Sequence, residues 1–141
     1  MRFEAGTEVA AEAGQVWAVL VDVERWSEWT PSVRRAARRE RGPLAVGATA
    51  RLEQPKLRPA VWRVTELTEG RSFSWESRSP GVRSLGEHRV LSLPDGRSRV
   101  ELAVTQSGPL AGPVGWLYGD LLRRYLRMEA DGLRRRCEQL T

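Results

Sequence analysis

His88 is the only histidine in the chain, and its imidazole is the one side chain that titrates near neutral pH without help from its surroundings. A neutral imidazole could take an acidic proton next to a carbonyl group, and the hydroxyl of Tyr118 or Tyr125 could hold the resulting enolate. These are the groups that a cyclase or dehydratase needs, so the three residues are the candidate catalytic residues. The alternative is a structural histidine, because no acidic residue at a nearby inward position is identified to orient its ring.

Other chemistries are disfavoured by what the sequence lacks. With no second histidine and one cysteine, Cys137, a tetrahedral zinc site would need several carboxylates, and none cluster at ligand spacing. No glycine-rich phosphate loop follows an expected strand, and no Gly-x-Ser-x-Gly elbow occurs. We therefore expect neither a metal nor a cofactor, and we expect Cys137 to be a buried, inert thiol.

The net charge of +5 comes almost entirely from arginine, since Lys56 is the only lysine. Two arginine clusters, at 34–41 and 123–136, could in principle contact phosphate groups. No nucleic-acid motif accompanies them, and acidic residues lie close to both: Glu40, Asp120, Glu129, Asp131 and Glu138. Solvated surfaces are the favoured interpretation, and an interaction module built on these clusters is the alternative.

The length of 141 residues, with 40% hydrophobic residues, predicts a single domain spanning 1–141. The first residues have neither a basic stretch nor an apolar one of the kind found in a secretion signal, and no apolar run is long enough to span a membrane. These features predict a cytoplasmic protein. They leave the oligomeric state open.

The C-terminal segment 109–141 has the period of a long amphipathic helix, which must bury its apolar side against the rest of the chain. Proline and glycine near 108–113 suit its first turn. The apolar side is expected to carry Val114, Leu117, Tyr118, Leu121, Leu122, Tyr125, Leu126, Met128, Leu133, Cys137 and Leu140.

The preceding segments predict one strand, two short helices and then six strands. Residues 3–9 alternate as a half-buried strand does, 12–21 fit a helix, and Asp22 stands at the N-cap position of a second short helix that carries Trp26 and Trp29. Turn signals then separate strands expected at 33–40, 48–54, 61–68, 72–79, 83–93 and 97–107. Short connections predict an antiparallel meander.

The apolar phase of each strand predicts which side chains point inward. On the strand at 83–93 the phase favours His88 and Val90. The polar side chains expected on the inward face are Gln54, Glu66, Ser77, His88 and Gln106, together with the hydroxyls of Tyr118 and Tyr125.

The order of elements, with the run Val16-Trp17-Ala18-Val19-Leu20-Val21-Asp22, the following Trp26-x-x-Trp29-x-Pro31 and the turn Pro94-Asp95-Gly96, resembles the START-like (SRPBCC) superfamily. Within it the chain is similar to the bacterial polyketide cyclase/dehydrase and lipid-transport group. The resemblance implies an α+β helix-grip fold, in which a seven-stranded, curved antiparallel sheet wraps around the long C-terminal helix. It also implies a deep cavity between them.

Such a cavity is expected to bind a hydrophobic small molecule, polycyclic or acyl. Its expected binding residues are Gln54, Trp62, Trp75, His88, Gln106, Tyr118, Leu121 and Tyr125. A polyketide cyclase, aromatase or dehydratase using the same cavity is the alternative, so the sequence leaves open whether the protein is an enzyme.

Overall fold

A computed structural model describes residues 1–140, and Thr141, the end of the expected C-terminal helix, lies outside the described residues. The elements follow the expected order: β1 (Arg2–Val9), α1 (Ala13–Val21), the short helix η1 (Val23–Glu28), β2 (Arg35–Arg38), β3 (Thr49–Glu53), β4 (Ala60–Thr68), β5 (Ser72–Ser79), β6 (Val82–Ser92), β7 (Ser98–Ser107) and α2 (Ala111–Gln139).

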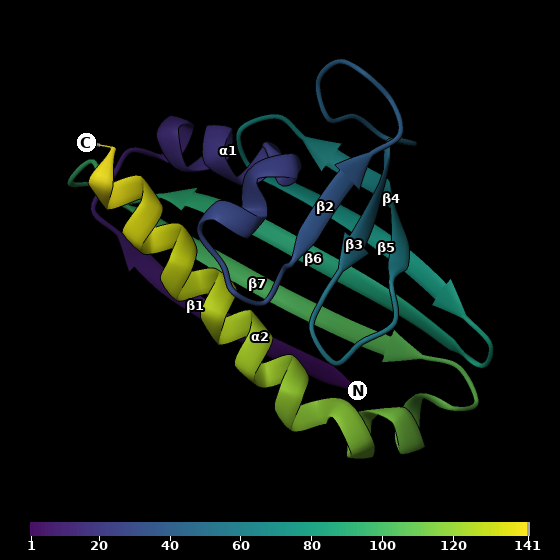
Figure 1. Cartoon of the computed structure of the whole chain (residues 1–141). Helices are drawn as coiled ribbons and strands as arrows, with labels where there is room; N and C mark the ends of the chain where they lie inside the picture. The colour runs from purple at the N-terminus through teal and green to yellow at the C-terminus, as the bar shows by residue number, and fades with distance from the viewer. Residues whose placement is uncertain (141) are drawn as a thin grey trace.

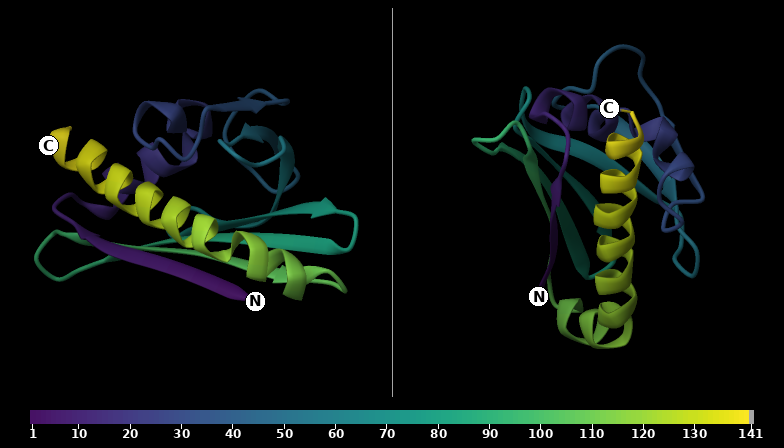
Figure 2. Two further views of the ribbon diagram at one scale, coloured as in Figure 1. Left: turned by 60° about the horizontal axis from the view of Figure 1, so that its bottom comes forward. Right: turned by 90° about the vertical axis from the view of Figure 1, so that its left-hand side faces the viewer.

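The strands form one seven-stranded antiparallel sheet in the order β1-β7-β6-β5-β4-β3-β2. The first strand therefore lies beside the last one. α2 crosses one face of the curved sheet, and α1 and η1 cover another part of it (Figure 1; Figure 2). The predicted α+β helix-grip fold is confirmed.

The strands keep the two-residue period expected from the sequence. On β3, Ala50 and Leu52 are buried while Arg51 between them is exposed. On β6, His88 and Val90 are both buried, which confirms their predicted inward direction.

One predicted inward residue, Glu66 on β4, is exposed instead. The pairing of β4 with β5 is irregular between Val64 and Glu66, where β4 has one residue more than its partner. Such a bulge shifts the phase of the following residues. Leu67 therefore packs against the core, and the prediction for Glu66 is wrong.

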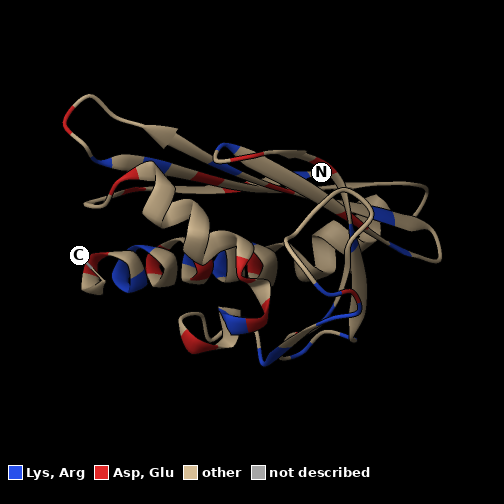
Figure 3. Ribbon diagram, turned by 90° about the horizontal axis from the view of Figure 1, so that it is seen from above, with Lys and Arg blue, Asp and Glu red and all other residues tan. Residues whose placement is uncertain are grey.

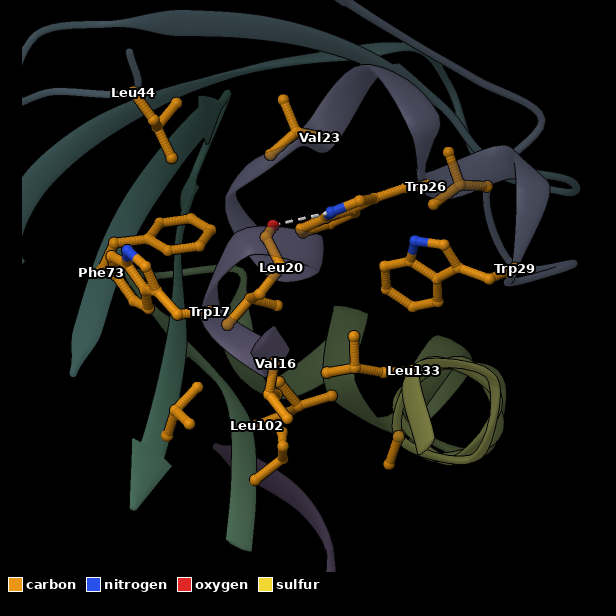
Figure 4. Packing of buried hydrophobic residues seen from close by; sticks show 14 of the residues in the cluster. Val16, Trp17, Leu20, Val23, Trp26, Trp29, Leu44, Phe73, Leu102 and Leu133 are labelled. Atoms are coloured by element: carbon orange, nitrogen blue, oxygen red, sulfur yellow. Dashed lines mark hydrogen bonds between the residues drawn. The ribbon is translucent and has the colours of Figure 1, made fainter. Parts of the chain in front are cut away.

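The second short helix is a 3₁₀ helix, and Asp22 does not cap it through its side chain. The Asp22 carboxylate instead lies 3.5 Å from the guanidinium of Arg25. The helix is held by its tryptophans, since the Trp26 indole donates a hydrogen bond to the carbonyl oxygen of Leu20 at 2.9 Å and packs near Trp29 (Figure 4).

The first turns of α2 face the sheet with glycine rather than with leucine. Gly115 and Gly119 are buried, and Gly119 lies against the ring of Phe3. This close packing turns Leu117 outward, where it is 65% exposed, and Leu140 at the far end is 61% exposed. Both were wrongly predicted on the buried side. Further along, the expected stripe holds for Tyr125, Leu126, Leu133 and Cys137.

Basic and acidic residues are interspersed along α2 (Figure 3). Ion pairs join Arg123 to Asp120, Arg127 to Asp131 and Arg136 to Glu28. The second arginine cluster thus has the arrangement of a solvated helix face. Within residues 1–140, no helix combines the length and apolarity needed to cross a membrane.

Gly132 on α2 lies against the backbone of Trp29, the residue that follows η1, and we expect Gly132→Ala to destabilise the fold by about 1–3 kcal/mol. An added Cβ would overlap the carbonyl oxygen of Trp29, a backbone atom that cannot move without shifting η1. Thermal unfolding measures the effect. Gly112→Ala on the same helix is the matched control, because nothing lies within 4 Å of its added Cβ. It should leave stability unchanged or raise it, and equal melting temperatures for the two variants would contradict the contact.

Candidate functional site: a cavity between the sheet and the C-terminal helix

A cavity of about 630 Å³ lies between the sheet and α2, a size typical of small-molecule sites. Trp26 of η1 and the loop 54–59 between β3 and β4 complete its wall. Leu121, expected in the site, is half-buried and does not line the cavity, whereas its neighbour Leu122 does. The expected residues that do line it are Gln54, Trp62, Trp75, His88, Gln106, Tyr118 and Tyr125.

Aromatic rings form much of the cavity wall. The rings of Trp62 and Trp75 lie 5.7 Å apart, and Trp75 and Trp26 lie 5.3 Å apart. Gly86 on β6 makes room for this arrangement, since an added Cβ would come within 2.9 Å of the Trp75 ring. The sheet therefore offers flat apolar surfaces to anything that enters.

His88 is held by the residues around it. Its Nδ1 donates a hydrogen bond to the carbonyl oxygen of Phe73 at 3.2 Å, and its ring stacks on the Phe73 ring at 4.1 Å. Burial lowers the pKa of His88 to about 4, so the ring is neutral at neutral pH. Among the described residues Nε2 has no hydrogen-bond partner, which leaves it as an acceptor.

Glu129 is the cavity residue that the sequence interpretation missed, because it was grouped with the acids near the arginine cluster. It lies four residues after Tyr125 and four before Leu133, both buried, so it shares their face of α2 and lines the cavity. That spacing was the available signal.

The Glu129 carboxyl has neither an ion pair nor a hydrogen bond with any residue in 1–140. Burial alone raises its pKa to about 8. Its side chain is half-buried and borders the cavity. At neutral pH it is therefore mostly protonated, and in this form the carboxyl can donate one hydrogen bond and accept others.

The other polar side chains differ in how free they are. The Tyr125 hydroxyl donates to the carbonyl oxygen of Pro55, so it holds the loop 54–59 in place. The Gln106 amide donates to Ser84 Oγ at 3.5 Å, and its buried oxygen has no partner among the described residues. Tyr118, 37% exposed, lies near the start of α2. Of the two candidate tyrosine donors, Tyr125 is thus already engaged.

The polar side chains of the cavity can offer hydrogen bonds to a ligand. The described part of the chain holds no group of three or more His, Cys, Asp or Glu residues arranged to bind a metal ion. Cys137 is buried, and burial raises the pKa of its thiol to about 11. The chamber therefore has several aromatic rings in its wall and unpaired polar groups that include those of His88, Gln106 and Glu129.

Comparison with known proteins gives one family match. A family model described as "Polyketide cyclase / dehydrase and lipid transport" matches residues 1–138. No curated protein matches the sequence.

Several solved structures share the fold. A hypothetical protein from Helicobacter pylori superposes with a TM-score of 0.82 at 15% identity, covering 97% of this chain and 88% of that one. The ZhuI aromatase/cyclase from Streptomyces sp. R1128 superposes with a TM-score of 0.79 at 21% sequence identity. The match covers 99% of this chain and 94% of that one. A START superfamily protein from Mycobacterium smegmatis superposes with a TM-score of 0.75 at 20% sequence identity, and the match covers 99% of each chain. At these identities the likeness concerns the fold alone.

Proposed function

The chain belongs to the polyketide cyclase/dehydrase and lipid-transport family, and from this premise we propose that it binds a hydrophobic small molecule, polycyclic or acyl, between the sheet and α2. The observation that carries the proposal is the cavity itself, about 630 Å³, whose wall includes the rings of Trp26, Trp62, Trp75, Tyr118 and Tyr125. Apolar surface that leaves water in such a chamber gives the binding free energy. The few unpaired polar groups then orient the ligand.

The proposal is tested by titrating an apolar fluorescent probe, such as an anilinonaphthalene dye, into the protein. We expect saturable binding near one probe per chain with quenching of tryptophan emission. Trp62→Ala should weaken binding about tenfold, since a ring contact of roughly 1 kcal/mol or more is lost.

Trp116→Ala is the matched control, because Trp116 is 85% exposed and does not line the cavity. It should leave probe affinity unchanged. Absence of saturable binding to the wild-type protein would overturn the proposal, and equal losses in both variants would place the probe elsewhere.

A second candidate function is a cyclase, aromatase or dehydratase using the same chamber. It is favoured by one observation: His88 offers an unpaired basic nitrogen and Glu129 an unpaired acid to the same cavity. Two groups whose pKa values are pushed in opposite directions are typical of acid–base pairs. A base with a pKa of about 4 is weak at neutral pH, however, which places binding first.

His88→Gln separates the two functions. For a binding protein, neither the variant nor the wild type should convert a poly-β-ketone analogue. Turnover by the wild type that His88→Gln abolishes, with probe binding intact, would establish the enzyme instead.

A further inference from the structure

The rim of the cavity is basic. Lys56 and Arg58 from the loop 54–59 and Arg78 near the end of β5 are exposed residues that line the cavity, so they mark where it meets solvent. Arg78 is paired with Glu76 at 3.4 Å, so the two loop residues supply the unpaired charge. Val114 and Tyr118, from the first turns of α2, line it as well.

Nothing in the described protein neutralises the two loop cations. Lys56 and Arg58 make no ion pair and no side-chain hydrogen bond with residues 1–140. Of the carboxylates that line the cavity, Glu87 is paired with Arg2 at 2.9 Å. The remaining one, Glu129, is mostly protonated at neutral pH, because burial raises its pKa to about 8. The cavity therefore carries uncompensated positive charge, and this charge lies at its rim.

The loop that carries these cations is fixed rather than free. The Tyr125 hydroxyl binds the carbonyl oxygen of Pro55, next to Lys56. Lys56 itself is the one non-glycine residue of the described chain with a positive φ, 67°. A left-handed conformation in a lysine costs free energy and persists only where the surroundings hold it. The backbone thus sets Lys56 at the rim.

Within residues 1–140, the inner part of the cavity, unlike its basic rim, offers no cation to a ligand. The chamber runs along α2 from Tyr118 to Glu129, a span of about 16 Å at the rise of an α-helix. Its inner part is closed by Trp26, which contacts His88. An anion placed there would lose its hydration without finding a cation, whereas a hydroxyl or carbonyl group would find Glu129 or His88 as a partner.

We propose that the ligand is an amphipathic anion, whose carboxylate or phosphate lies against Lys56 and Arg58 at the rim while its apolar body fills the chamber up to Glu129. This inference rests on the proposed function, since it names the chemical class of the same ligand. The rim lets the anion keep part of its hydration, so the attraction of two cations is not cancelled by burial. The cations at the rim and their absence from the interior therefore determine that the apolar end of the ligand enters the chamber first.

The test compares dodecanoate and dodecyl phosphate with methyl dodecanoate, a neutral ligand of similar shape, by displacement of the fluorescent probe. We expect at least one anion to bind the wild-type protein about tenfold more tightly than the ester. In Lys56→Ala/Arg58→Ala this preference should vanish while the affinity for the ester stays the same. Whichever anion shows the larger preference identifies the head group.

Arg34→Ala/Arg134→Ala is the control, because it removes the same charge from two exposed arginines that do not line the cavity. It should retain the preference for the anion. Equal affinity of acid, phosphate and ester for the wild type, or an equal loss in the control variant, would overturn this inference and leave the proposed function standing. Failure of all three to displace a bound probe would count against the proposed function itself.

Discussion

Replacing Glu129 by Gln should stabilise the protein by about 3–5 kcal/mol at pH 8 and above, and should change nothing near pH 4. Burial raises the folded-state pKa of Glu129 to about 8 from 4.5. Between these values the unfolded chain loses the proton while the folded protein keeps it, so the stability of the wild type falls as the pH rises. Glutamine resembles the protonated acid and avoids this loss.

Denaturant unfolding of both proteins from pH 4 to pH 9 measures the difference. His88 changes the pH dependence of stability in the opposite direction. Its pKa is about 4 in the folded protein and 6.5 in the unfolded chain, so stability is lost as the pH falls from 6.5 to 4. It is present in both proteins, so its effect cancels. Asp120→Asn, an exposed carboxylate on the same helix, is the control and should show no such trend. A pH-independent difference for Glu129→Gln would mean that its carboxyl is solvated.

Leu133→Ala should destabilise the fold by about 2–5 kcal/mol, the cost of removing a fully enclosed leucine side chain. Leu133 is 0% exposed and belongs to the same buried cluster as Val16, Leu20 and Trp29, which are labelled with it in Figure 4. Thermal or denaturant unfolding gives the value directly.

Leu117→Ala is its matched partner, because it makes the same chemical change on the same helix at a residue that is 65% exposed. The expected change is within about 0.5 kcal/mol. Both leucines belong to the apolar stripe seen in the sequence, so the pair also tests whether the helix buries the whole stripe. Equal costs would show that the first turns of α2 are covered in solution.

The fold could be predicted because its information is local. Alternation along β3 and β7 and glycine turns between strands define a meander, and the resemblance to a known superfamily joins these elements into one architecture. The wrong predictions of which side chains point inward have physical causes that the periodicity of the sequence does not reveal. The bulge before Glu66 depends on how β4 pairs with β5, and the outward turn of Leu117 depends on glycine contacts with β1.

The sequence predicts the aromatic residues that line the candidate site better than it predicts the roles of the polar side chains. Trp62 and Trp75 follow from strand phase alone. The role of Tyr125 depends on a loop carbonyl distant in sequence, which no helical period reveals. Glu129 was assigned to the surface because a carboxylate normally prefers water, and only the structure places it against the chamber. A charged residue type at a buried position is assigned wrongly by a sequence pattern, because the pattern assumes that charged side chains face water.

The pairing of the first strand with the last has a consequence for the order of folding. The hairpins from β4 to β7 close over short turns, whereas Met1 meets Gln106 across 105 residues of chain. Closing so long a loop costs more conformational entropy and is repaid only once β7 is in place. We therefore expect β1 and α2 to dock late. Because α2 forms one wall of the chamber, a ligand would recognise only the completed protein, and its binding free energy would act wholly against unfolding.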